Sequence, residues 1–351
     1  MLPRIKTKQL NIAGVPLGGQ NKVLIQSMCN IKTSKIKEVV KQINEAALLG
    51  ASLMRVSILD QDDAYALKEI KKQTIIPIVA DIHFDYKLAL LALENGADKI
   101  RLNPGNISDP NKIKEIVQLC KKYKVPIRVG VNFGSLDKES ASLEGVSLSE
   151  KLLHSAKKQI AILENFNFYE IVVSLKGSDV LSTIEAYRLA KDIFPYPLHL
   201  GITEAGPKDI GLIRSVAGLA PLLSEGIGDT IRISLSDEPK EEIIAAKRLL
   251  HDLNLYPNYP TIISCPTCGR TEVDVVKMAK KVLTYLEKRN LALKVAVMGC
   301  VVNGPGEAKD ADYGLAGGKN KWVLFKKGQV IKTVSEDEAY EILIKEIEKD
   351  Y

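Results

Sequence analysis

The chain has 351 residues, of which 46% are hydrophobic and 26% charged, a composition typical of a folded globular protein and not of a disordered or collagen-like chain. Its 49 Lys and Arg residues against 43 Asp and Glu give a formal charge of +6, a mild excess that does not by itself indicate a polyanionic partner. The five cysteines are too few, and odd in number, for a disulfide-stapled secreted scaffold.

The N-terminal residues are too charged to form the apolar core of a signal peptide. No stretch approaches the ~18 uninterrupted apolar residues that a membrane span requires. We therefore expect a cytoplasmic protein that does not bind membranes. Thiols stay reduced in that compartment, so a close cysteine pair there indicates metal or redox chemistry.

Short apolar segments rich in β-branched residues alternate with segments of helical periodicity along the first 255 residues. Eight strands are predicted, at Val23–Met28, Leu53–Ile58, Pro77–Ile82, Lys99–Asn103, Pro126–Asn132, Glu170–Leu175, Leu198–Thr203 and Thr230–Leu235. The first helix is predicted to begin at a Ser34 cap and to end at Gly50. Another begins at Asp109 and Pro110 and carries Cys120 on its apolar stripe.

Eight strand–helix units of about 30 residues each predict a (β/α)8 barrel of the TIM type. An open parallel sheet is the alternative, but no glycine-rich dinucleotide fingerprint follows the first strand. The segment Leu255–Pro260 (LYPNYP) is typical of a domain boundary, so we expect residues 1–255 to form the barrel and 256–351 a small α/β domain. The predicted order there is strand Thr261–Ser264, a helix carrying Val275 to Leu286, strand Lys294–Met298, a glycine-rich loop, a hairpin of Trp322–Phe325 and Gln329–Val334, and a terminal helix.

Positively charged residues recur in or just after the predicted barrel strands, namely Arg55, Arg101, Arg128, Lys176 and Arg232. The carboxyl ends of barrel strands form the active-site face, so these cations are expected around one pocket. Because isolated buried charge is costly, they need anionic partners or contact with solvent. One alternative is that each pairs with a carboxylate such as Asp81, Glu204 or Asp229. The five together favour a substrate with phosphate or diphosphate groups.

Polar residues at the same strand ends complete the predicted pocket. They are Asp81, His83, Asn103, Asn132, Ser174, His199, Thr203, Glu204 and Ser234. Glu204 is a candidate for passing a proton to a leaving oxygen, and its alternative role is to orient an arginine or a hydroxyl group. We expect His83 and His199 to be neutral, hydrogen-bonded wall residues and not catalysts.

Three cysteines follow neighbouring strands of the predicted small domain. Cys265 and Cys268 form a Cys-x-x-Cys pair after one strand, and Cys300 follows the next. The pair alone fits zinc, a redox dithiol or an iron–sulfur cluster. Structural zinc lacks a fourth ligand, since every histidine lies in the first domain, and a dithiol leaves Cys300 unexplained. A 4Fe-4S cluster on three thiolates leaves one iron for a weaker oxygen ligand, for which Glu307 is the candidate.

Eight collinear segments now indicate a family. They are Ile25–Met28 (IQSM), Ala80–Tyr86 (ADIHFDY), Arg101–Asn106 (RLNPGN), Arg128–Asn132 (RVGVN), Leu198–Gly206 (LHLGITEAG), Gly226–Thr230 (GIGDT), Cys265–Cys268 (CPTC) and Gly299–Glu307 (GCVVNGPGE). From about residue 4 onward the sequence resembles the 4-hydroxy-3-methylbut-2-enyl diphosphate synthases, in their compact two-domain bacterial form. Similar sequences often read Met-Thr-Asn-Thr and Lys-Ala-Ser-Asp at the segments that begin here with Met28 and Lys176, which affects local pocket contacts.

The resemblance implies an iron–sulfur oxidoreductase that opens the ring of 2-C-methyl-D-erythritol 2,4-cyclodiphosphate by two-electron reduction and dehydration. Its product, (E)-4-hydroxy-3-methylbut-2-enyl diphosphate, belongs to the methylerythritol phosphate pathway of isoprenoid biosynthesis. The implied ligands of a 4Fe-4S cluster are Cys265, Cys268, Cys300 and Glu307. The implied substrate contacts are Arg55, Arg101, Arg128, Asn132, Lys176, Thr203, Glu204, Arg232 and Ser234.

The resemblance also implies partners. Electrons would arrive singly from reduced flavodoxin or ferredoxin, and the barrel of one subunit would be closed by the cluster domain of another in a head-to-tail homodimer. Two rival hypotheses stay open: a cluster-free sugar-phosphate barrel with a structural zinc, and a nucleic-acid-binding protein with a zinc knuckle. The aromatic content of 5% and the cations at strand ends disfavour nucleic acid as a partner.

Overall fold

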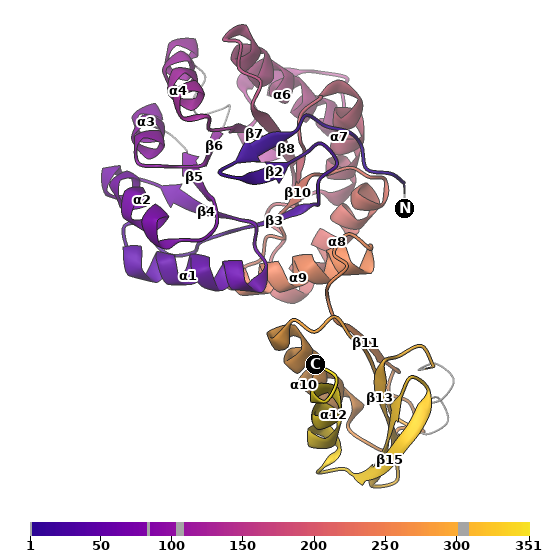
Figure 1. The fold of residues 1–351 in the computed structure, drawn as a ribbon. Helices are drawn as coiled ribbons and strands as arrows, with labels where there is room; N and C mark the ends of the chain where they lie inside the picture. Colours follow the sequence, from indigo (N-terminus) through magenta and orange to yellow (C-terminus); the bar gives the residue numbers. More distant parts are fainter. Residues whose placement is uncertain (1, 83–84, 103–108, 301–308) are drawn as a thin grey trace. The chain divides into compact units, whose positions relative to one another are not determined.

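The computed structural model describes residues 2–82, 85–102, 109–300 and 309–351, and the ribbon is drawn in Figure 1. The chain forms two compact units, Met1–Leu255 and Tyr256–Tyr351. None of the helices in the described ranges has the length and apolar character needed to cross a membrane.

Eight parallel strands form the centre of the first unit, in the order β8-β7-β6-β5-β4-β3-β10-β9. They are β3 (Leu24–Met28), β4 (Leu53–Ile58), β5 (Ile78–Ile82), β6 (Lys99–Leu102), β7 (Ile127–Asn132), β8 (Ile171–Lys176), β9 (His199–Leu200) and β10 (Thr230–Ile231). A parallel bridge between Val173 of β8 and Leu198, just before β9, joins the two edges of this sheet. The predicted (β/α)8 barrel is confirmed and the open sheet is excluded, although β9 and β10 are shorter than predicted.

Helices surround the barrel (Figure 1). They are α1 (Ile36–Leu49), α2 (Gln61–Gln73), α3 (Tyr86–Glu94), α4 (Pro110–Tyr123), α5 (Lys138–Ser142), α6 (Leu148–Asn165), α7 (Val180–Ile193), α8 (Lys208–Ser224) and α9 (Pro239–Asp252). The left-handed Gly50 ends α1 and Asp109 caps α4, as predicted, and Cys120 is buried. The Ser34 cap was wrong: Lys35 precedes α1 without a side-chain cap, and the Ser34 N–H donates to Asp63 Oδ1 at 2.8 Å.

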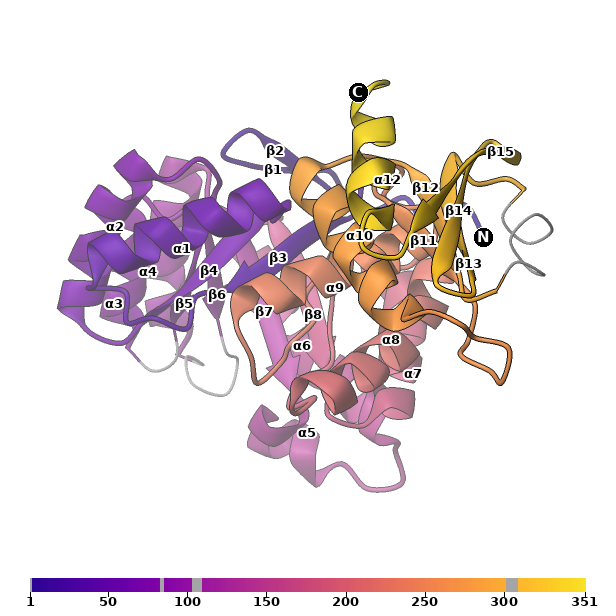
Figure 2. The same ribbon diagram turned by 90° about the horizontal axis from the view of Figure 1, so that it is seen from below.

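A short antiparallel hairpin, β1 (Leu10–Ile12) and β2 (Val15–Leu17), was not predicted. Its apolar side chains form one buried cluster with residues from the first two positions of four barrel strands. The members are Leu10, Ile12, Leu17, Leu24, Leu53, Val79 and Val172. In Figure 2 the hairpin lies on the side of the barrel opposite to α5, which follows β7. The hairpin therefore plugs the amino-terminal end of the barrel and leaves polar chemistry to the other end.

The second unit contains a five-stranded sheet in the order β11-β12-β13-β14-β15, with two helices packed on it. The elements are β11 (Thr261–Ser264), α10 (Val275–Arg289), β12 (Lys294–Met298), β13 (Tyr313–Gly318), β14 (Lys321–Lys326), β15 (Gln329–Ser335) and α12 (Ala339–Glu348). The three strands β11, β12 and β13 are parallel, and the remaining pairs are antiparallel. The buried side chains Val282, Leu286, Trp322 and Leu343 belong to an apolar core.

Strand β13 lies in a segment that was predicted to be a glycine-rich loop. It pairs along its whole length with β14, and its Gly314 stands opposite Phe325. A Cβ atom at Gly314 would lie 2.0 Å from the Phe325 ring, so glycine is required for this close approach. Glycine, which suggested a loop in this segment, is thus needed at Gly314 so that the strand can pack against the Phe325 ring.

Candidate functional site

The five predicted cations come together at the carboxyl end of the barrel. The register places Arg101 beside both Asp81 and Arg128, and Met28 beside Arg55. Arg101 is 6% exposed, Arg128 2% and Lys176 6%, while the Arg55 and Arg232 side chains are 11% and 16% exposed. We call these five residues, together with Asp81 and Glu242, the barrel mouth.

Asp81 of β5 is the carboxylate on one side of the barrel mouth. It accepts a hydrogen bond from Arg101 Nη1 at 3.1 Å, and Arg55 Nε lies 3.6 Å from its other oxygen. The pairing predicted as an alternative for Asp81 is therefore confirmed. The same alternative was wrong for Asp229, which pairs at 2.9 Å with Arg4 and not with a barrel-mouth arginine.

Glu242 of α9 holds Arg232 on the other side. Its two carboxylate oxygens accept from Arg232 Nε and Nη2 at 3.0 Å each, and also from the Ser27 hydroxyl at 2.6 Å and the Leu235 N–H at 3.1 Å. A bidentate pair of this kind fixes the plane of the guanidinium. Arg232 is therefore aimed by a carboxylate that the sequence analysis did not identify.

The thioether of Met28 lies between the two arginines that flank it. Arg55 directs Nε and Nη2 at Met28 Sδ from 3.1 and 2.8 Å, and Arg232 Nη1 lies 3.7 Å away. A thioether is a weak acceptor without charge. It therefore separates the two guanidinium groups without neutralising either of them.

Arg128 forms no ion pair with any carboxylate in the described part of the chain. Its Nε and Nη1 are buried and have no hydrogen-bond partner among the residues that the structure describes. Burial lowers the pKa of Arg128, and the neighbouring Arg55 and Arg101 lower that pKa further, while Asp81 opposes the change. Buried, unsatisfied guanidinium donors are costly, so this one points to an anionic ligand.

Lys176 completes the cationic wall. A Cβ at Gly201, the residue after β9, would lie 2.4 Å from Lys176 Nζ and 2.8 Å from Arg232 O, so the missing side chain at Gly201 makes room for the amine. Burial and the charges of Arg128, Arg232 and Arg55 lower the pKa of Lys176 well below its usual value. A bound anion would reverse this effect.

The polar residues predicted for the pocket differ in exposure. Asn132, Thr203 and Ser234 are partly buried at the ends of β7, β9 and β10, and Glu204 is exposed. Glu204 adopts a left-handed backbone conformation with φ of 53°, and its carboxylate contacts no hydrogen-bond or ion-pair partner within the described ranges. It does not pair with a barrel-mouth arginine. The predictions for His83 and Asn103 fall outside the described residues.

His199 is a fully buried wall residue, as expected. Its Nδ1 lies 3.4 Å from the Thr230 hydroxyl. Burial lowers the pKa of His199 well below its usual value, and the positive charges of Lys176, Arg128, Lys99 and Arg55 lower it further. The imidazole is therefore neutral, although its Nε2 has no hydrogen-bond partner among the described residues.

Three polar residues of the first unit, two on barrel strands and one on a helix, were missed by sequence reasoning. Lys99 precedes Arg101 by two residues, so strand alternation alone places both on one face. Gln26 shares the inward face of β3 with Met28 in the same way. Glu242 lies on α9 and carries no local signal, because only the closed barrel brings that helix beside Arg232.

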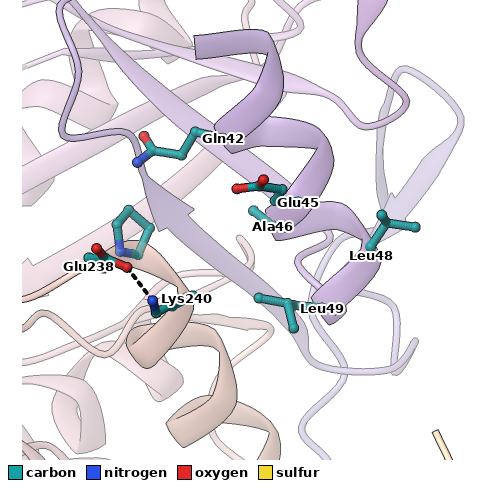
Figure 3. Close-up of a pocket in the computed structure, with 8 residues that line it drawn as sticks. Gln42, Glu45, Ala46, Leu48, Leu49, Glu238 and Lys240 are labelled. Atoms are coloured by element: carbon teal, nitrogen blue, oxygen red, sulfur yellow. Dashed lines mark ion pairs between the residues drawn. The ribbon is translucent and has the colours of Figure 1, made fainter. Parts of the chain in front are cut away.

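A groove of about 350 Å³ lies on the outside of the barrel, between α1 and α9 (Figure 3). It is lined by Gln42, Glu45, Ala46, Leu48, Leu49, Glu238, Pro239 and Lys240. Its one charge pair, Glu238 with Lys240 at 2.6 Å, is exposed to solvent. The groove shares no lining residue with the barrel mouth and offers no chemistry comparable to it.

In the second unit, two cysteine segments approach each other at neighbouring strand ends. Cys265 follows β11 and Cys300 follows β12, and these strands pair in parallel with Ser264 opposite Val297. The Gly299 N–H donates to Cys265 Sγ at 3.1 Å. Hydrogen bonds from the backbone and side chain of Arg270 lower the pKa of Cys268. The Cys268 thiol thus lies among donor groups that favour its thiolate form.

The donor set at this corner is suited to iron–sulfur chemistry. Backbone N–H groups that donate to cysteine sulfur are typical around such clusters. Within the described ranges, no three His, Cys, Asp or Glu side chains are close enough to bind a metal ion, and Glu307 lies outside those ranges. Cys265 is half-buried, Cys268 exposed and Cys300 buried.

A closed barrel with an unbalanced cationic mouth, joined to a small unit with cysteines at strand ends, defines a barrel enzyme that binds an anionic substrate. The family model of the GcpE TIM-barrel domain matches residues 7–247, and that of the GcpE protein C-terminal domain matches residues 261–349. The chain therefore belongs to the GcpE family and is an enzyme.

Curated relatives extend over almost the whole chain. The 4-hydroxy-3-methylbut-2-en-1-yl diphosphate synthase (flavodoxin) of Caldanaerobacter subterraneus is 50% identical over 343 residues, which cover 98% of this chain and 97% of that protein. The protein of the same name from Bacillus subtilis is 48% identical over 345 residues, 98% of this chain and 92% of that protein. A solved dihydropteroate synthase from Stenotrophomonas maltophilia aligns with 69% of this chain and 97% of its own, with a TM-score of 0.52 and 14% identity, which shows the fold alone.

Proposed function

We propose that the chain converts 2-C-methyl-D-erythritol 2,4-cyclodiphosphate into (E)-4-hydroxy-3-methylbut-2-enyl diphosphate in the methylerythritol phosphate pathway. The reaction consumes two electrons and two protons, opens the ring and releases water. The observation that carries this proposal is the barrel mouth, where Arg128 is buried beside four further cations and has no ion-pair partner among the residues that the structure describes. A diphosphate supplies the missing negative charge, and the relatives named above make a diphosphate product.

The chain's own residues bind and orient this substrate. Arg128 and Lys176 hold the phosphate groups from the buried wall, while Arg55, Arg101 and Arg232 are pre-oriented by Asp81 and Glu242. Such fixed donors stabilise negative charge without reorganising during the reaction. The remaining proposed contacts come from Asn132, Thr203, Glu204 and Ser234.

Glu204 is the proposed proton relay. Its carboxylate is exposed at the carboxyl end of the barrel and contacts no partner among the described residues, so it is available to a ligand. Its left-handed backbone holds it in a conformation that is strained for a residue with a Cβ. A carboxylate held in this way can accept a proton from solvent and then donate it to a departing oxygen.

The proposed ligands of a 4Fe-4S cluster are Cys265, Cys268, Cys300 and Glu307. When bound, the cluster supplies single electrons and an iron with a displaceable oxygen ligand. The Gly299 N–H bond to Cys265 Sγ supports this assignment, because backbone N–H groups that donate to cysteine sulfur are typical around such clusters. Flavodoxin, named for the relatives, is the proposed electron donor, and ferredoxin is the alternative. We place the reaction in the cytoplasm, where these thiols stay reduced.

Iron content tests the cluster. After anaerobic reconstitution the full chain should bind iron, show a visible charge-transfer absorption, and turn over the cyclodiphosphate with reduced flavodoxin. Cys300→Ser should lose the iron and the turnover, whereas Cys120→Ala, at a core cysteine on α4, should keep both. A wild-type protein without iron would refute the cluster, and a zinc-loaded, active protein would support the sugar-phosphate alternative.

We further propose a head-to-tail homodimer in which the second unit of one chain completes the barrel of another. Mixing inactive Arg128→Ala and Cys300→Ser subunits tests this assembly. If sites form between chains, mixed dimers contain one intact site, and random mixing restores roughly a quarter of wild-type activity. If each chain forms its own site, mixing restores nothing.

A further inference from the structure

A polar layer lies deeper in the barrel than the mouth. Lys99 is the first residue of β6 and pairs with Val79 of β5. Val79 belongs to the apolar cluster that the β1–β2 hairpin forms at the amino-terminal end of the barrel. The Lys99 side chain is fully buried, and its Nζ donates a hydrogen bond to Gln26 Oε1 at 2.9 Å. The proposed reaction does not use this lysine. Its position raises the question of what balances its charge.

The groups around Lys99 do not supply a negative charge. Burial lowers the pKa of the Lys99 amine well below its usual value, and the positive charges of Arg128 on β7 and Arg55 on β4 lower it further. Gln26 on β3 is neutral, and the buried His199 on β9 is neutral as well. Asp81, the carboxylate on β5, is engaged by Arg101 and Arg55.

The barrel interior has more cations than carboxylates. Lys99, Arg55, Arg101, Arg128, Lys176 and Arg232 are six basic groups, and Asp81 and Glu242 are the two carboxylates placed with them. Residues 83–84 and 103–108, which lie outside the described ranges, contain no Asp or Glu in the sequence. Arginine does not release its proton in proteins, whereas a buried lysine does. The excess charge is therefore relieved at a lysine.

Of the two lysines, Lys99 is the one that solvent does not reach. Lys176 retains 6% exposure at the mouth, while Lys99 retains none. The bond to Gln26 needs only one N–H, which a neutral amine still provides. A neutral Lys99 thus keeps its observed contact and avoids an uncompensated charge in the core.

We propose that Lys99 is uncharged in the unliganded barrel and takes up one proton from solvent when a diphosphate binds at the mouth. The ligand's negative charge compensates Arg128 and Arg55, and the amine becomes an ammonium ion that still donates to Gln26. No other bond forms or breaks. Lys99 then favours ligands with two phosphate charges over ligands with one. The identity of the ligand rests on the proposed function, but the coupling between anion and proton does not.

Calorimetry measures this coupling directly. The full-length protein is titrated with the cyclodiphosphate, without reductant, at one pH in two buffers of different ionisation enthalpy. The difference in binding enthalpy gives the number of protons taken up. We expect net uptake in the wild type, loss of most of one proton in Lys99→Met, and wild-type behaviour in Lys41→Met, an exposed lysine on α1.

The pH dependence of affinity gives a second readout. A proton bound only in the complex makes the wild-type affinity fall as pH rises, by up to about tenfold per pH unit. The affinity of Lys99→Met should vary less with pH over the same interval. A purely structural role for Lys99 would weaken binding equally at every pH.

Each outcome separates the two proposals. Tight cyclodiphosphate binding with the same proton uptake in wild type and Lys99→Met would overturn the role of Lys99 and leave the proposed function intact. Absence of cyclodiphosphate binding in the folded wild type would overturn the proposed function and this coupling with it. If Lys99→Met does not fold, nitrogen NMR of labelled lysine in the wild type decides the question, because a Lys99 amine that keeps its charge state on ligand binding contradicts the proposal.

Discussion

The two units of this protein treat charge in opposite ways. The barrel buries six basic groups within or just after its strands, where they meet one carboxylate of a strand, Asp81, and one of helix α9, Glu242. The second unit fills its core with apolar side chains such as Val282, Leu286, Trp322 and Leu343. Burying unbalanced charge lowers stability, whereas apolar packing raises it. The buried charges of the barrel therefore lower its stability but provide the donors that we propose for ligand binding. In the second unit the apolar core stabilises the sheet in which β11 and β12, the strands before Cys265 and Cys300, are paired.

The largest expected effect comes from replacing Arg128, whose buried guanidinium has no ion-pair partner within the described ranges. Arg128→Ala should lower kcat/KM for the cyclodiphosphate by about 10²–10³-fold, because it removes donors fixed toward the developing charge. Iron content and the visible spectrum should not change, since Arg128 belongs to the barrel. Arg188→Ala, whose partner Glu225 lies on the outer surface, serves as control and should retain activity. Loss of iron in Arg128→Ala would mean that this arginine is structural.

In the second unit the expected damage is to packing. Gly314→Ala places a Cβ 2.0 Å from the Phe325 ring and should lower the free energy of unfolding by about 1–3 kcal/mol. The chain's single tryptophan, Trp322, lies in this core, so its fluorescence during urea unfolding reports on this unit. Gly269→Ala is the matched control, because a Cβ there meets nothing within 4 Å. Equal stability of both variants would show that the ring of Phe325 yields freely.

A smaller effect is expected where a barrel charge is held by a carboxylate. Glu242→Gln replaces one acceptor oxygen by an NH₂ group that faces the donors of Arg232, Ser27 and Leu235. Arg232 should therefore lose its fixed orientation. We expect KM for the cyclodiphosphate to rise about tenfold, with a smaller change in kcat. Glu225→Gln, in the exposed pair with Arg188, should leave KM within about twofold. A fall in kcat alone would assign Glu242 a role beyond positioning Arg232.

The sequence predicts the elements whose signals are local. The eight strands of the barrel, the Asp109 cap of α4 and the Gly50 end of α1 follow from periodicity and capping chemistry. The β1–β2 hairpin does not, because its apolar residues gain a partner only when the barrel closes above them. Strand β13 was not predicted because its glycines are typical of a loop. Gly314 is needed there because the Phe325 ring of β14 leaves no space for a side chain.

The same limit applies to the site. The barrel-mouth cations could be identified because each lies in or just after a strand of its own. Glu242 could not, because it comes from a helix that reaches Arg232 only through the fold. Asp229 illustrates the reverse error: it neighbours β10 in sequence, yet its partner is Arg4 of the N-terminal segment. Charge pairing depends on distance in space, which single-sequence patterns do not contain.

The last prediction concerns how the free energy of unfolding of the barrel, compared between the wild type and Lys99→Met, changes with pH. Burial lowers the pKa of Lys99 below its ordinary value of 10.5, so the unfolded chain binds more protons than the folded one between the lowered pKa and 10.5. The wild-type barrel should therefore gain stability relative to Lys99→Met as pH rises through that interval, by up to about 1.4 kcal/mol per pH unit.

The prediction concerns only how the stability difference between the wild type and Lys99→Met changes with pH, and not its absolute size. The Gln26 oxygen that loses its partner in Lys99→Met costs free energy at every pH and shifts the two curves by a constant amount. Urea unfolding at several pH values measures the slope, with circular dichroism for the barrel and Trp322 fluorescence for the second unit. The fluorescence transition should be the same in both proteins, because the second unit is unchanged. A stability difference independent of pH would mean that Lys99 keeps its proton in the folded barrel, and that Gln26 alone is sufficient to hold a buried ammonium ion.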